Sequence, residues 1–192
     1  MNRDTIARPF LEEDSGWVDL YWTAWELAWD HVIDNPDLPH TPYLDEAFQP
    51  DRIWIWDSCF MILFARYAPQ VFPCAQTLDN LYALGLEGAE APMRIHHPDN
   101  PPLPAWAERE LYRITGDRER LRRVLVDEAL LPRWFERFET FTPGERPAWA
   151  ECEAALKRER EGYRWAGCPS GMDNTPRGDF DYDSIYWVDA LA

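Results

Sequence analysis

The sequence has few basic residues and no long apolar run, and each shortage excludes a class of protein. Its 19 lysines and arginines are outnumbered by 35 aspartates and glutamates, which gives a formal net charge of −16. Nucleic acids and anionic membrane surfaces need a basic partner, so we expect neither. No run of about 18 apolar residues is present, so we expect no transmembrane helix. The opening segment "MNRDTIARPFLEED" also lacks the apolar core of a signal peptide.

Cysteine is also sparse. The four cysteines, at positions 59, 74, 152 and 168, are far apart and include no CxxC pair. At a length of 192 residues this spacing does not indicate a disulfide framework. We therefore predict reduced thiols in a cytoplasmic protein that uses no cofactor.

Aromatic residues are abundant. Hydrophobic residues make up 46% of the chain, which is too many for a disordered acidic protein, and 11 residues are tryptophan. Some of these indoles must lie in the core. Indoles beside carboxylates also suit carbohydrate, because sugar C–H faces stack on indole while hydroxyls bond to acids and amides. Composition alone does not separate the two explanations.

Apolar spacing of three and four residues predicts a chain of helices. Gly116 should end one helix, and Asp117 should cap the next, which Pro132 should kink or split. No credible multi-strand pattern is present, so the predicted fold class is all-α, in one domain over residues 1–192. The expected helices lie at 16–33, 53–69, 71–86, 103–116, 118–141, 148–162 and 183–192. The last is short and has no stop signal, from which we expect a truncated domain.

The stretch "WIWDS" has two interpretations. Trp54 and Trp56 alternate around Ile55, so an extended backbone would place both indoles on one face, with Asp57 following at the start of the apolar helix. In one interpretation the indoles are core and Asp57 is a helix cap. In the other they form a sugar platform beside a carboxylate that binds two hydroxyls. Local spacing supports both equally.

The stretch "HHPDNPPL" favours a turn that starts a helix. His96, His97 and Asp99 suggest a metal, but adjacent histidines lie on different sides of the chain and no third ligand is well spaced. Asn100 could point its amide at a substrate from this turn. The later stretch "DFDYDS" lacks the glycine and the distal glutamate of a calcium loop. We therefore predict no metal site.

The stretch "SGMDNTPR" forms part of a long acidic loop. Asp173 has Asn174 beside it and Arg177 four residues on, so turn donors and a guanidinium are available to hold its carboxylate. The local alternative is a simple Asx turn.

Four stretches occur in an order that resembles one group of enzymes. These stretches are "IWIWDSCFMILFARY", "TLDNLYAL", "HPDNPPLPAWAERELYRITGD" and "SGMDNTPRG". The chain is similar here to the mannosylglycerate-hydrolase-like glycoside hydrolases, which are related to glycoside hydrolase family 63 and to trehalases, the six-hairpin glycosidases. The resemblance implies an (α/α)6 toroid, of which this chain would be the first half, with the active site at its loop-rich end.

The resemblance also implies roles for individual residues. Asp173 would be the general acid of an inverting reaction, Trp54, Trp56 and Asp57 would line the sugar subsite, and Asn100 would contact substrate through its amide. Arg94 or Arg177 could pair with a glycerate carboxylate. The substrate would be a small α-glycoside such as glucosylglycerate or mannosylglycerate.

The resemblance is incomplete. Inverting hydrolysis needs a second carboxylate to activate water, and the family's glutamate base falls on no residue of this sequence. The stretch "ALGLEGAEAPMRIHHPDN" also looks shortened relative to the family. Two other hypotheses therefore stay open: a non-catalytic helical remnant or carbohydrate-binding scaffold, and a sugar epimerase that uses a histidine pair. The sequence does not indicate an oligomeric state.

Overall fold

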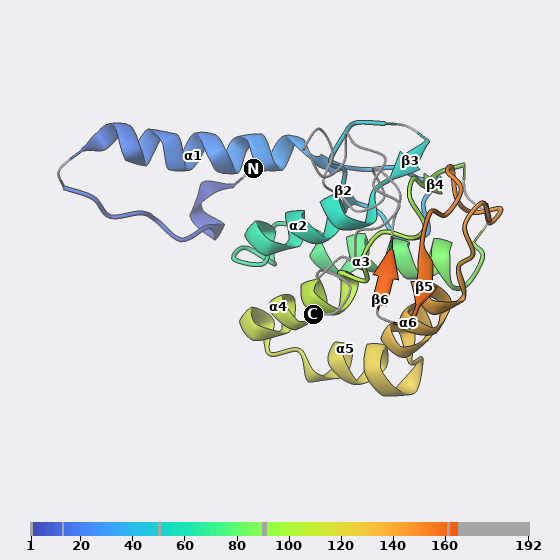
Figure 1. The fold of residues 1–192 in the computed structure, drawn as a ribbon. Helices are drawn as coiled ribbons and strands as arrows, with labels where there is room; N and C mark the ends of the chain where they lie inside the picture. Colours follow the sequence, from blue (N-terminus) through green and yellow to red (C-terminus); the bar gives the residue numbers. More distant parts are fainter. Residues whose placement is uncertain (1, 13, 50, 90–91, 161, 165–192) are drawn as a thin grey trace.

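The structure is a computed structural model that describes residues 2–12, 14–49, 51–89, 92–160 and 162–164. Within these ranges the chain forms six α-helices, one short 3₁₀ helix, one π-helical turn and three two-stranded sheets (Figure 1). The predicted all-α toroid is therefore wrong, and the fold is a mixture of helices and small sheets. In the described part of the chain, no helix has the length and apolar character needed to cross a membrane.

The first helix, α1 (Ser15–Asp30), follows the short 3₁₀ turn η1 (Arg3–Thr5). Asp14 caps α1 by accepting a 2.8 Å hydrogen bond from the backbone N–H of Gly16. The helix extends away from the rest of the molecule as an arm (Figure 1). Its contact with the body is aromatic, because the Trp25 ring lies 5.4 Å from the Phe72 ring, centroid to centroid.

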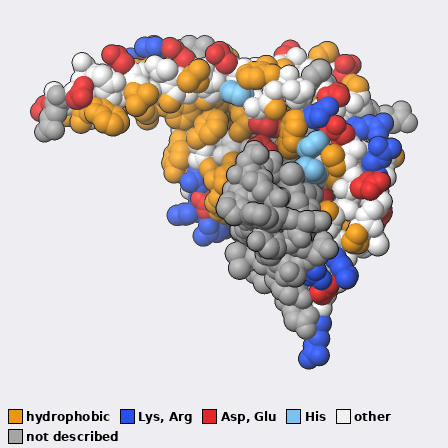
Figure 2. Space-filling view, turned by 45° about the horizontal axis from the view of Figure 1, so that its top comes forward, with side chains coloured by type: hydrophobic (Ala, Val, Ile, Leu, Met, Phe, Trp, Pro, Cys, Tyr) orange, Lys and Arg blue, Asp and Glu red, His pale blue; other side chains and the backbone are white. Residues whose placement is uncertain are grey.

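Much of the apolar surface of this arm is exposed. Figure 2 shows hydrophobic side chains along the arm and onto the adjoining body. Trp17, Leu20 and Leu27 of α1 are 62%, 56% and 60% exposed. Further along the chain, Phe60 and Phe64 of helix α2 (Ile55–Ala65) are exposed as well. The two phenylalanines of α2 therefore reach the surface of this chain.

Three pairs of short strands replace segments that we expected to be helical or irregular. β1 (Val32–Ile33) pairs antiparallel with β2 (Tyr43–Leu44), and β3 (Arg52–Ile53) pairs in parallel with β4 (Arg94–Ile95). β5 (Lys157–Glu159) pairs antiparallel with β6 (Gly162–Arg164). The β3–β4 pairing joins segments far apart in sequence, which local spacing does not reveal, whereas β5 and β6 form a local hairpin inside a segment that we expected to be helical.

The helices of the body lie close to their predicted positions. α2 (Ile55–Ala65) packs on α3 (Cys74–Gly85) and on α4 (Pro104–Thr115). Gly116 ends α4 in the left-handed conformation at a φ of 63°, as predicted. The helix expected at 118–141 is instead divided into α5 (Arg118–Arg122), the π-helical turn η2 (Arg123–Asp127) and α6 (Leu130–Thr140). We predicted a kink or break at Pro132. The break falls before that residue, and Pro132 lies in the first turn of α6.

The helix expected at 148–162 does not form. Backbone pairing takes its place, because Ala150 forms a parallel bridge with Ile95, and β5 and β6 follow. The last expected helix, at 183–192, lies outside the described residues.

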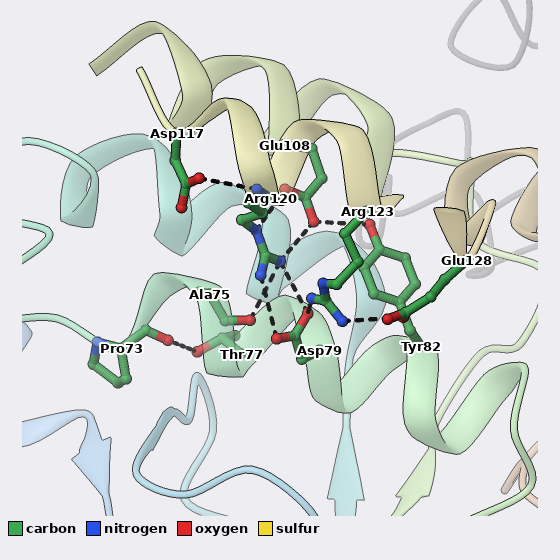
Figure 3. Close-up of polar contacts among 10 residues, drawn as sticks. All are labelled: Pro73, Ala75, Thr77, Asp79, Tyr82, Glu108, Asp117, Arg120, Arg123 and Glu128. Atoms are coloured by element: carbon green, nitrogen blue, oxygen red, sulfur yellow. Dashed lines mark hydrogen bonds and ion pairs between the residues drawn. The ribbon is translucent and has the colours of Figure 1, made fainter. Parts of the chain in front are cut away.

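A buried charge network joins α3, α4 and α5 (Figure 3). The guanidinium of Arg120 donates to Glu108 at 2.7 and 2.9 Å and to Asp79 at 3.2 Å, and Tyr82 donates its hydroxyl to Glu108 at 3.1 Å. Glu108 is only 3% exposed. The adjoining cavity of about 10 Å³ has room for no ligand larger than a water molecule, so we assign this network a structural role.

Candidate functional site

The start of α2 positions the three residues of the predicted sugar platform. The strand β3 ends at Ile53, Trp54 is the extended N-cap residue with φ −104° and ψ 130°, and the helix begins at Ile55. Trp56 and Asp57 therefore lie in the first helical turn. The expected extended "WIWDS" segment is wrong, but the turn from strand to helix still brings both indoles to one site.

Asp57 is not the cap of this helix. The N-cap residue is Trp54, which makes no side-chain capping bond. A carboxylate in the first turn interacts favourably with the helix dipole, by about 0.3–1 kcal/mol. The capping interpretation is therefore replaced by a carboxylate at the positive end of α2, beside a cavity.

A cavity of about 290 Å³ opens at this point. Its volume lies just below the range of about 300–1,000 Å³ typical of small-molecule sites. Its lining combines aromatic rings with carboxyl and imidazole groups, a mixture that suits a ligand with both apolar faces and hydroxyls. The polar and aromatic residues of the lining are Glu46, Trp54, Trp56, Asp57, His96 and His97.

Glu46 lies in the loop between β2 and β3 and is held against the start of α2. Its Oε1 accepts a 2.7 Å hydrogen bond from the Trp54 backbone N–H, and its Oε2 accepts a 3.4 Å bond from the Ser58 hydroxyl. Burial raises the pKa of Glu46 to about 8, with repulsion from Asp45 and Asp57 adding to the effect. The carboxyl therefore keeps its proton at neutral pH and can donate a hydrogen bond, unlike an ordinary glutamate.

A second, larger cavity of about 630 Å³ shares these carboxyls. Glu46 and Asp57 line it together with apolar side chains that include Trp25, Phe60 and Phe64. The two carboxyl groups therefore border both an apolar space along α1 and α2 and the polar cavity beside the histidines. This arrangement allows a ligand with a polar head and an apolar body to contact both spaces.

The histidines reach the polar cavity through backbone pairing. His96 follows β4, and its N–H donates a 2.9 Å bond to the Ile53 carbonyl, which sets it beside Trp54. The ring of His96 lies 4.9 Å from the Trp54 ring, centroid to centroid. On its other side, the His96 carbonyl accepts a 3.0 Å bond from the N–H of Cys152.

The surroundings of these imidazoles differ. His96 Nδ1 lies 2.6 Å from Glu151 Oε2, and Glu151 is also paired with Arg52 at 3.0 Å. Burial, together with the neighbouring His96, lowers the pKa of His97 to about 4. Burial and Glu151 raise the pKa of the Cys152 thiol, which argues against a free thiolate nucleophile. His96, His97 and Cys152 together are the described residues whose donor atoms cluster as metal ligands do.

The remaining predicted site residues are not brought to this cavity. Asn100 is completely buried, and its backbone N–H donates a 3.3 Å bond to the His97 carbonyl, so it helps to shape the turn behind the histidines. It is not among the residues that line the polar cavity. Asp173 and Arg177 lie outside the described residues, so their roles stay predictions.

Sequence reasoning missed Glu46 and did not place the two histidines at this cavity. Glu46 lies in the loop "LDEAFQP", which carries no motif, and only its contact with the start of α2 singles it out. The third partner of the histidines is Cys152, which lies 56 residues from His96 and in a segment predicted to be helical. Comparison of the chain with protein-family models, with curated proteins and with solved structures finds no match.

Proposed function

We propose that this chain is an inverting glycoside hydrolase that binds a small α-glycoside, such as glucosylglycerate or mannosylglycerate, in the polar cavity at the start of α2. The observation that carries the proposal is the joint presence of two indoles and two carboxyls in one cavity, where Trp54, Trp56, Glu46 and Asp57 meet. This combination matches what a sugar requires, namely flat apolar surfaces for its C–H faces and polar groups for its hydroxyls.

The two carboxyls have complementary roles in this proposal. Asp57, at the N-terminal turn of α2, accepts hydrogen bonds from sugar hydroxyls. Glu46 keeps its proton at neutral pH, because burial raises its pKa to about 8, and therefore donates to a hydroxyl or ring oxygen. A site with both a donor and an acceptor of this kind fixes the orientation of the sugar ring.

The chemical step in the proposal belongs to Asp173. Glycosidic cleavage needs an acid that protonates the leaving oxygen and a second carboxylate that activates water. We assign the first role to Asp173 by its resemblance to the general acid of the mannosylglycerate-hydrolase-like enzymes, with Arg177 and Asn100 as further substrate contacts. No residue is assigned as the general base. We place the activity in the cytoplasm, in keeping with the free thiols of Cys59, Cys74 and Cys152.

Calorimetric titration of the 192-residue chain with glucosylglycerate, mannosylglycerate and free glycerate tests the binding site. Asp57→Asn and Trp56→Ala should each weaken binding of the glycosides by at least tenfold. Trp17→Ala is the matched control, because that indole is 62% exposed on α1 and lies outside the polar cavity, and it should leave affinity unchanged.

Hydrolysis is measured in parallel, as release of free sugar. Because no residue of this sequence is assigned as the general base, we expect this chain by itself to bind the glycosides without hydrolysing them, as a non-catalytic carbohydrate-binding scaffold also would. Turnover that Asp173→Asn abolishes would separate the two, because it would show that a base is present and that Asp173 is the acid. Absence of binding, or equal affinity in the Asp57→Asn and Trp17→Ala variants, refutes the sugar site.

A further inference from the structure

We propose that His96, His97 and Cys152 form a binding site for one zinc-type divalent metal ion. The sequence predicted no metal site here, because the two histidines lacked a well-spaced third ligand. In the structure the third ligand comes from residue 152, which backbone pairing brings beside His96. The proposal is independent of the sugar site, since it concerns the binding of an ion by groups that need no sugar.

The backbone fixes the three residues relative to one another. Ile95 accepts a 2.9 Å hydrogen bond from the N–H of Glu151, and His96 accepts a 3.0 Å bond from the N–H of Cys152. Ile95 also donates a 3.0 Å bond to the carbonyl of Trp149. The N–H and the carbonyl of Ile95 therefore both bond to the segment 149–152, and the His96 carbonyl adds a third bond. These three bonds hold the segment in one register along residues 95–96.

The donor atoms lie at distances that a shared ion can bridge. One donor atom from each of His96, His97 and Cys152 lies within 4.8 Å of the other two. The Cys152 sulfur is 3.7 Å from His96 Nδ1 and 3.9 Å from Nε2. Zinc bonds of about 2.0–2.1 Å to nitrogen and 2.3 Å to sulfur separate tetrahedral ligands by about 3.3–3.6 Å. The sulfur is almost equidistant from the two nitrogens of His96, so ion binding requires the imidazole to turn until Nε2 faces the ion and the sulfur to move closer by a few tenths of an ångström.

The surroundings of both imidazoles favour metal binding. His96 Nδ1 lies 2.6 Å from Glu151, and this carboxylate is itself held by Arg52. Donation of Nδ1–H to a carboxylate leaves the Nε2 lone pair available, which is the carboxylate–histidine–metal arrangement found in zinc proteins. Nδ1 of His97 is buried and, in the part of the chain that the structure describes, has no hydrogen-bond partner. A buried nitrogen of this kind lacks a bond that a metal would supply.

The ligand set selects the class of ion. Two imidazoles and one thiolate are ligands for zinc, cobalt, nickel or copper, whereas calcium and magnesium require oxygen. Three protein ligands leave a fourth tetrahedral position open, as in catalytic zinc sites. Both histidines line the polar cavity, so the open position is accessible to water or to a small ligand there.

Cobalt substitution of the untagged 192-residue chain, stripped with a chelator, tests the site directly. We expect one Co²⁺ per chain, visible d–d bands of a tetrahedral centre, and a near-ultraviolet sulfur-to-cobalt charge-transfer band. Zinc should displace the cobalt stoichiometrically, whereas millimolar calcium or magnesium should not. A chain that binds neither cobalt nor zinc at micromolar concentration refutes the proposal.

Variants then assign the ligands. Cys152→Ser should abolish the charge-transfer band, and His97→Ala should weaken zinc binding by at least 100-fold. Glu151→Gln should weaken it by about tenfold, as loss of an outer partner does. Cys74→Ser is the matched control, because this buried thiol lies in α3 and should not affect the band.

Circular dichroism of each variant shows whether it has folded. A folded Cys152→Ser variant that keeps the charge-transfer band refutes the proposal, as does loss of the band in Cys74→Ser. If Cys152→Ser does not fold, the wild-type spectrum and the Glu151→Gln titration decide the question. A wild-type spectrum without a sulfur band, or an affinity for zinc that Glu151→Gln leaves unchanged, then refutes it.

Discussion

Replacing Glu46 by glutamine should remove part of the pH dependence of stability. Burial raises the pKa of Glu46 from its ordinary value of 4.5 to about 8. Because the folded-state value is the higher one, the folded chain holds this proton more tightly than the unfolded chain does. The contribution of Glu46 to stability is therefore complete below about pH 4.5 and is lost as the pH rises towards 8.

The magnitude follows from the size of the shift. Each pKa unit corresponds to about 1.4 kcal/mol, and partial exposure of the side chain reduces the total, so we expect about 2–3 kcal/mol between pH 5 and pH 8. Glutamine keeps an oxygen for the Trp54 N–H and carries no charge at either pH. The Glu46→Gln variant should therefore match the wild type at pH 5 and be more stable than it at pH 8.

Urea unfolding at the two pH values measures this difference directly. The exposed Glu12 provides the control, because Glu12→Gln should change stability by the same small amount at both pH values. Other groups that titrate in this range affect the wild type and the variant alike, so they cancel in the comparison. An identical wild-type-minus-variant difference at pH 5 and pH 8 would show that Glu46 is not the buried acid that we describe.

Three further perturbations test other parts of the structure. Arg120→Ala should destabilise the chain by about 3–5 kcal/mol in urea, because it leaves Glu108, 3% exposed, without its cation; a cost near zero would show the network to be solvated. Gly116→Ala should lower stability by about 1 kcal/mol, since its φ of 63° strains any side chain although no atom lies within 4 Å of the added carbon; unchanged thermal unfolding would contradict that helix end. Trp56→Ala should lower stability by less than Trp134→Ala does, because Trp134 is fully buried in the core whereas Trp56 lines a cavity. Urea midpoints that place the two variants in the opposite order would contradict the assignment of Trp56 to a cavity.

The helices were largely predictable because their signals are local. Gly116 as a left-handed stop and Asp117 as a cap both act within one turn of the residue concerned. The segment 148–162 shows the limit of this reasoning. Its charge and alanine content favour a helix, but pairing of Ala150 with Ile95 prevails. Such pairing depends on a partner about 55 residues away in sequence, which a local pattern does not reveal.

The candidate site divides in the same way. Trp54, Trp56 and Asp57 lie within four consecutive residues, so the sequence identified them together, and all three line the cavity. Glu46 and Cys152 come from loops without a recognisable motif. They became candidates only when the fold placed one against the start of α2 and the other beside His96.

Buried residues on one side of the small parallel ladder fix the functional residues on the other. Ile53, Ile95 and Ala150 are each completely buried, and each is followed directly by a residue of the site, namely Trp54, His96 and Glu151. Since alternate residues of an extended strand point to opposite faces, burial of the first set directs the second set outward. A shift of one residue along any of the three segments would bury a polar group and expose an apolar one. The energy of the core therefore keeps Trp54 beside His96 and His96 beside Glu151, although none of these three contributes to the apolar core itself.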